Sequence, residues 1–173
     1  MQKHREHFEI QSQAFRTQRD NLKKEEMIVV HDFTTIQEVA SIHEKCYNIA
    51  TYFQNENGEA HWHYFDYLSF DPKDENYVMQ SWEHFIDQGN IPKEVTKIYV
   101  WSDTGLRWNC FLSFFSEAQN LYNKTFEVHY FAEYHGHSIC DGHFGNIERN
   151  LETKFWESHH FPHPIQNSNR RNG

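Results

Sequence analysis

The stretch that decides the fold is "MIVVHDF", residues 27–33, which opens with four consecutive apolar residues. A continuous apolar run of this length, bounded by polar sequence, is typical of a strand buried on both faces of a sheet. We therefore expect this strand to lie inside the sheet, with a neighbour on each side. Asp32 stands near its end, where the apolar run stops.

Two more strands follow directly. "KCYNIATYFQ" (45–54) and "AHWHYFDYLSF" (60–70) are rich in aromatic and β-branched residues, and "NENG" (55–58) separates them. Short Asn- and Gly-containing segments between two such runs are strong hairpin signals. The sequence therefore predicts three antiparallel strands at the start of the domain.

The rest of the chain alternates between helix and strand. Residues 71–90 carry apolar side chains at helical spacing and stop at a glycine, and the segments 108–122 and 144–155 repeat the helical spacing. Two extended segments, "VTKIYVWSD" (95–103) and "TFEVHYFAEYH" (125–135), separate these helices.

The predicted fold class is thus α/β, with the order βββαβαβα and a five-stranded mixed sheet flanked by helices, in which three antiparallel strands precede two parallel ones. Right-handed crossovers place the fourth strand beside the first and the fifth strand outside the fourth.

Chain length and composition favour one folded domain. The chain has 173 residues, of which 17% are aromatic, a content that disordered sequences lack. We expect residues 1–26 to be an N-terminal helical connector without a convincing apolar face, residues 27–157 to be the core, and residues 158–173 to be a flexible tail.

Charge and cysteine content limit the classes of function. The net charge of -9 argues against a domain that binds nucleic acid by its own surface charge. The first twenty residues contain no apolar segment of the signal-peptide type, and no stretch approaches the roughly 18 apolar residues of a membrane span. Three cysteines are too few for a disulfide framework. We therefore expect a nuclear or cytoplasmic protein that is neither secreted nor bound to a membrane.

Three aspartates mark a candidate site. Asp32 ends the first strand and Asp103 ends the fourth, at the point where strand order changes direction and where ligands of α/β sheets gather. Asp141 opens the helix after the fifth strand. Three neighbouring carboxylates repel one another unless hard cations such as Mg²⁺ or Mn²⁺ compensate them. Two such ions, roughly 4 Å apart, support in-line phosphodiester displacement.

Structural roles compete with this interpretation. Aspartates at strand ends often form turns, and Asp141 at a helix start is a natural N-cap. Glu148 is the alternative third acid, because it lies seven residues after Asp141 on a similar helix face. At a rise of about 1.5 Å per residue the two are about 10 Å apart along the helix, so we expect only one of them to serve the metal pair.

The element order and these acids resemble the RNase H-like catalytic core of DDE/DDD transposases and retroviral-type integrases. The resemblance spans about residues 27–157. More closely, "VHDFT", "IYVWSDTG" and "HYFAEYHGHSICDGHFG" are similar to transposon-derived proteins that have a V-x-D-F strand, a W-S-D-G strand end and an H-G-K-x-x-C-D-G segment.

The resemblance implies roles for particular residues. Asp32, Asp103 and Asp141 match the acidic positions and would be both catalytic residues and metal ligands. His137 stands where the family has lysine, and Thr104 where it has glycine. We assign substrate binding to Arg107 and His137, Arg107 because an arginine just after Asp103 can hold a phosphate.

The expected activity is DNA cleavage and strand transfer with Mg²⁺ or Mn²⁺. DNA would be held through additional domains that are not visible in this chain, and a homo-oligomer is conceivable. The alternatives are a non-catalytic, domesticated or degenerate RNase H-like interaction module, and a metal-dependent nuclease without transposition.

The histidines offer a rival metal site. Cys140 and His143, with His135 or His137 nearby, have ligand types that suit zinc. Such a site normally needs two separated ligand pairs, and the sequence shows only one. His61 and His63 lie two residues apart on one face of their strand, an arrangement that is usually solvated.

Overall fold

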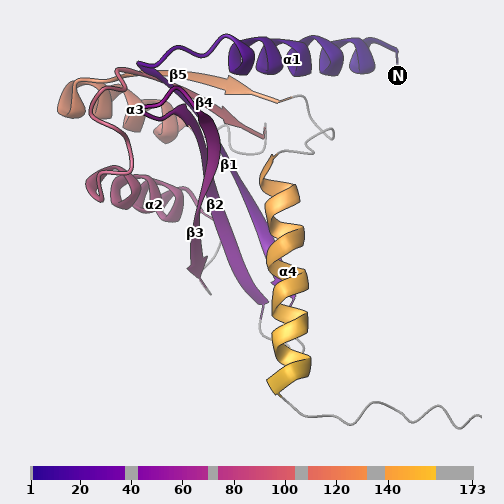
Figure 1. The fold of residues 1–173 in the computed structure, drawn as a ribbon. Coiled ribbons are helices and arrows are strands. Elements are labelled where there is room, and N and C mark those ends of the chain that lie inside the picture. The colour runs from indigo at the N-terminus through magenta and orange to yellow at the C-terminus, as the bar shows by residue number, and fades with distance from the viewer. Residues whose placement is uncertain (1, 38–42, 70–73, 104–108, 132–138, 159–173) are drawn as a thin grey trace, which may run out of the picture.

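The computed structural model describes residues 2–37, 43–69, 74–103, 109–131 and 139–158. Within them the chain forms an open five-stranded sheet with helices on both faces (Figure 1). The helices are α1 (Gln2–Asp20), α2 (Glu75–Asp87), α3 (Asn109–Tyr122) and α4 (Ile139–Ser158). The strands are β1 (Glu26–Gln37), β2 (His43–Gln54), β3 (Ala60–Ser69), β4 (Lys97–Ser102) and β5 (Thr125–Tyr130).

The sheet order is β3-β2-β1-β4-β5, which confirms the predicted mixed sheet. β1 pairs antiparallel with β2 and parallel with β4, while β2 pairs antiparallel with β3 and β4 parallel with β5. The prediction that Asp32 ends the first strand is wrong: the pairing of β1 with β2 continues to Gln37, so Asp32 lies inside β1. β5 ends at Tyr130, earlier than predicted, and residues 132–135 of the expected strand lie outside the described residues.

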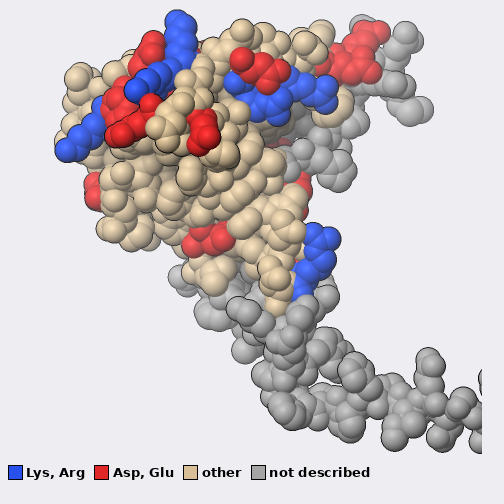
Figure 2. Space-filling view, in the orientation of Figure 1, with Lys and Arg blue, Asp and Glu red and all other residues tan. Residues whose placement is uncertain are grey.

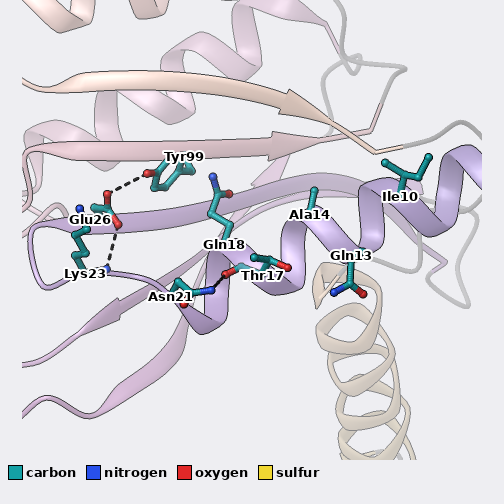
Figure 3. Close-up of a pocket in the computed structure, with 9 residues that line it drawn as sticks. All are labelled: Ile10, Gln13, Ala14, Thr17, Gln18, Asn21, Lys23, Glu26 and Tyr99. Carbon is teal, nitrogen blue, oxygen red and sulfur yellow. Dashed lines mark hydrogen bonds between the residues drawn. The ribbon is translucent and has the colours of Figure 1, made fainter.

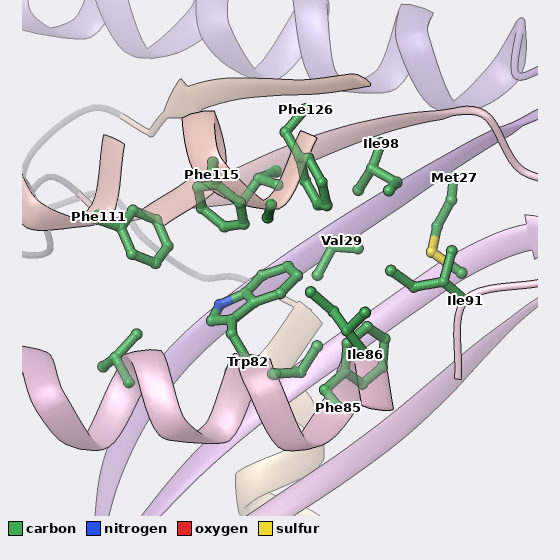
Figure 4. Close-up of a cluster of buried hydrophobic side chains, with 14 of the residues drawn as sticks. Met27, Val29, Trp82, Phe85, Ile86, Ile91, Ile98, Phe111, Phe115 and Phe126 are labelled. Carbon is green, nitrogen blue, oxygen red and sulfur yellow. The ribbon is translucent and has the colours of Figure 1, made fainter. Parts of the chain in front are cut away.

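The larger hydrophobic cluster lies between the sheet and helices α2 and α3. Trp82 of α2 is fully buried, and its ring meets Phe85 and Phe115 edge to face (Figure 4). Met27 and Val29 of β1 complete this side, as alternate residues of a strand do. Full burial of one large side chain contributes about 1.5 to 3 kcal/mol, so the many buried residues of this cluster contribute strongly to stability.

The second hydrophobic cluster joins α1 and α4 to the opposite face of the sheet. Trp101 of β4 is central to it: Phe15 of α1 meets its ring at 5.3 Å, and Gln18 accepts a hydrogen bond from its indole nitrogen at 2.6 Å. Phe144 of α4 belongs to the same cluster. α1 is therefore a helix that packs on the sheet through Phe15 and Gln18, although its sequence has no convincing apolar face.

Local signals behave as their chemistry requires. Gly58 closes the β2–β3 hairpin with φ +81°, and its N–H donates to the Asn55 carbonyl at 3.0 Å. Asp74 caps α2, because its side chain accepts a hydrogen bond from the Tyr77 N–H. No helix in the described ranges is both long enough and apolar enough to cross a bilayer.

Candidate functional site

Asp32 and Asp103 lie side by side where the pairing of β1 with β4 ends. β1 and β4 run parallel, and their last paired residues are His31 and Ser102. Asp32 and Asp103 are the next residues on the two strands. Neighbouring strands lie about 4.8 Å apart, so the two aspartates are neighbours across the middle of the sheet.

The two aspartates also share a face. Val30 and Trp101, two residues earlier on each strand, both belong to the cluster covered by α1 and α4. Side chains alternate along a strand, so Asp32 and Asp103 project toward the same side. Asp32 is half-buried and its carboxylate accepts a hydrogen bond from the Phe33 N–H at 2.7 Å, whereas Asp103 is exposed.

The start of α4 lies over the same face. Asp141 stands in the first turn of α4 and is half-buried. The thiol of Cys140 donates a long hydrogen bond to the Val30 carbonyl, with 3.6 Å between sulfur and oxygen. Val30 is two positions before Asp32, and Cys140 directly precedes Asp141, so this contact brings the start of α4 near Asp32.

The other predicted site residues are either exposed or outside the described ranges. Glu148 is exposed on α4. Arg107 and His137 lie outside the described residues. Within the described ranges, no three His, Cys, Asp or Glu side chains are arranged as a group that could hold a metal ion. The structure thus brings two carboxylates together and a third to the same side of the sheet.

The three aspartates suit a magnesium ion even though they do not form a closed set of ligands. Mg²⁺ prefers oxygen ligands and is usually held by one or two carboxylates, waters and substrate phosphates. Asp32 and Asp103 supply such carboxylates where the parallel pairing of β1 and β4 ends, and Asp141 offers another from α4. The donor set therefore suits Mg²⁺ or Mn²⁺.

The sequence did not reveal that a polar row continues across the sheet from Asp32. Asn48 of β2 is the direct partner of Asp32, and Asp66 of β3 is the direct partner of Asn48. The Asn48 amide nitrogen donates to the Asp66 carboxylate at 2.8 Å. One signal was present: Asp66 interrupts the series Trp62, Tyr64 and Leu68 on one face of β3.

Cys140 and His143, the candidate zinc ligands, both contact the sheet. Cys140 bonds to a backbone carbonyl, and the His143 ring nitrogen lies 2.9 Å from the Asp66 carboxylate. His135 lies outside the described residues, and His61 and His63 are exposed on β3. Both residues of the Cys-x-x-His pair therefore serve contacts between α4 and the sheet.

A groove lies elsewhere, between α1 and the beginning of the sheet (Figure 3). Its volume is about 680 Å³, and Gln13, Gln18, Glu26 and Tyr99 are among its lining residues. Glu26 accepts a hydrogen bond from the Tyr99 hydroxyl at 3.0 Å. Glu26 is six residues before Asp32 on β1, about 20 Å away, and none of the three aspartates is among the described lining residues.

Surface charge is mixed on the face that Figure 2 shows. Basic and acidic side chains are interspersed there, without a broad basic area. No protein-family model matches the chain, and no curated protein matches it significantly. The functional inference therefore rests on the strand order and on the placement of the three aspartates.

Proposed function

We propose that this chain is an RNase H-like catalytic core of the DDE/DDD transposase type, which cleaves and transfers DNA strands with divalent metal ions. The observation that carries the proposal is the adjacency of Asp32 and Asp103, on one face, where the parallel pairing of the central strands β1 and β4 ends. A strand order of β3-β2-β1-β4-β5 agrees with the expected βββαβαβα topology.

Each residue has a defined task in this proposal. Asp32 and Asp103 hold the cation together, and the Phe33 N–H orients the Asp32 carboxylate. Asp141 is the third ligand and Glu148 its alternative. Held by these residues, Mg²⁺ or Mn²⁺ would supply activation of the attacking water or 3′ hydroxyl and stabilisation of the leaving oxygen. Exposure of Asp103 leaves this edge open to a phosphodiester.

DNA would reach this edge with help from elsewhere. The net charge of -9 repels a phosphate backbone, and binding to DNA is otherwise driven by the release of counterions. We therefore propose that additional DNA-binding domains hold the substrate for this core, in the nucleus or cytoplasm.

Calorimetric titration with Mn²⁺ tests the metal site. The parent protein is expected to bind Mn²⁺, and Asp32→Asn and Asp103→Asn are expected to abolish binding while remaining folded. Asp20→Asn is the matched control, because Asp20 is exposed on α1 and pairs with its neighbour Arg19. Absence of Mn²⁺ binding in the parent would refute the metal-dependent enzyme and leave the interaction module.

Incubation with supercoiled plasmid and with a short duplex that has a free 3′ end separates the two enzyme classes. A transposase core joins the duplex to the plasmid in Mg²⁺ or Mn²⁺, whereas a nuclease only nicks the plasmid. Asp141→Asn and Glu148→Gln, compared in the same assay, identify the third acid: the variant that abolishes cleavage has lost it.

A further inference from the structure

His143, in the second turn of α4, contacts the edge strand β3. Its ring nitrogen Nε2 lies 2.9 Å and 3.1 Å from the two carboxylate oxygens of Asp66 on β3. The ring also stacks on Tyr64 of β3, with 4.2 Å between centroids and 7° between planes. Two contacts of different kinds thus fix one side chain.

Asp66 is itself held in place. It accepts a hydrogen bond from Asn48 at 2.8 Å and one from the Cys46 thiol at 3.7 Å. Asn48 and Cys46 are fully buried on β2, and Asn48 pairs directly with Asp32. His143 therefore binds to a carboxylate whose position is set by the strand next to Asp32.

The geometry of α4 relates this contact to Asp141. Successive residues of a helix are rotated by about 100°. Cys140 faces the sheet through its bond to Val30, so His143 lies about 60° to one side of it and Asp141 about 100° to the other. Because His143 points toward β3, Asp141 is turned toward the opposite flank of α4.

That opposite flank faces the acidic edge. α4 contacts β1 and β2, and the sheet order places β3 on one side of them and β4 on the other (Figure 1). A side chain on the flank away from β3 therefore points toward β4, where Asp103 lies beside Asp32. Any rotation of α4 that breaks the contact with Asp66 also moves Asp141.

We infer that Asp66 and His143 are a positioning pair, which sets the rotation of α4 so that Asp141 faces Asp32 and Asp103. The inference deepens the proposed function, because it assigns residues that orient the third acid without touching the metal or the DNA. Partners that orient metal ligands are typically worth 10- to 100-fold in metal affinity.

The rotation of α4 is tested without metal by amide hydrogen exchange. His143→Ala and Asp66→Ala are expected to raise exchange in residues 139–147 by about tenfold or more, and the double variant to raise it no further than either single change. His143→Gln, whose amide can still donate to Asp66, is expected to restore slow exchange. His61→Ala is the control, because His61 is exposed on β3.

Mn²⁺ affinity, measured under conditions where every variant is folded, tests the link to the site. His143→Ala and Asp66→Ala are expected to weaken Mn²⁺ binding about tenfold, and His143→Gln to recover it. Unchanged exchange in residues 139–147, equal increases throughout the chain, or unchanged Mn²⁺ affinity beside faster exchange would each overturn the inference. If the parent binds no Mn²⁺, the proposed function fails, while hydrogen exchange still decides whether the pair fixes α4.

Discussion

His31 makes the stability of this protein sensitive to acid. It lies on the face of β1 opposite to Asp32, fully buried among Trp82, Phe111 and Tyr47. Its Nδ1 is 2.7 Å from the Tyr47 hydroxyl, and its Nε2 has no hydrogen-bond partner among the described residues. Burial lowers the pKa of His31 from 6.5 to about 3, because an imidazolium ion would lose its hydration there.

The direction and size of the effect follow from this shift. Below pH 6.5 the unfolded chain takes up a proton on His31 that the folded chain does not, so stability is highest above pH 6.5 and falls as pH decreases toward 3. Well below pH 6.5 this effect approaches about 1.36 kcal/mol per pH unit, so a fall from pH 7.5 to 4.5 costs about 2.7 kcal/mol through His31 alone.

Urea denaturation at pH 7.5, 6.5, 5.5 and 4.5 measures this cost. Other histidines and carboxylates titrate too, so the readout is the difference between the parent and His31→Gln, which keeps a polar group near Tyr47 and does not titrate. The parent is expected to lose about 2.7 kcal/mol more than His31→Gln between pH 7.5 and 4.5. His61→Gln, at an exposed position, is expected to follow the parent. Equal losses in the parent and His31→Gln would refute the reasoning.

Three further changes test the packing and the local structure. Trp82→Ala is expected to reduce the free energy of unfolding by about 3 to 5 kcal/mol in urea denaturation, because it empties the centre of the larger cluster; a loss below about 1 kcal/mol would contradict its place there. Asp74→Ala removes the cap of α2 and should lower the free energy of unfolding by about 1 kcal/mol, whereas Asp74→Ser should keep most of the cap's contribution. Thermal melts followed by circular dichroism measure both. Gly58→Ala should cost about 1 kcal/mol because φ is +81°; no atom crowds the position, so the cost comes from the backbone alone. Gly58→Asn should cost less, because Asn tolerates this conformation better. A stabilised Ala variant in the same melts would show that the turn has another shape.

The strand order could be predicted from the chain because its signals are local and strong. The apolar run ending at Asp32, the turn at 55–58 and the helical spacing around Trp82 each define an element without reference to the others. Short connections and right-handed crossovers then leave few ways to arrange five strands. The side-by-side placement of Asp32 and Asp103 followed from that order alone, whereas their role as metal ligands stays a prediction.

The contacts that hold α4 over the sheet were decided only by tertiary structure. Asp66 and His143 are separated by 77 positions in the chain and meet at 2.9 Å. Their meeting depends on the pairing of β2 with both β1 and β3 and on the rotation of α4. Local spacing shows that α4 is a helix, but its rotation is set by how Cys140, Phe144 and His143 pack against residues far away in sequence. The sequence by itself therefore determined the elements and their order, and packing between distant segments determined which polar groups meet.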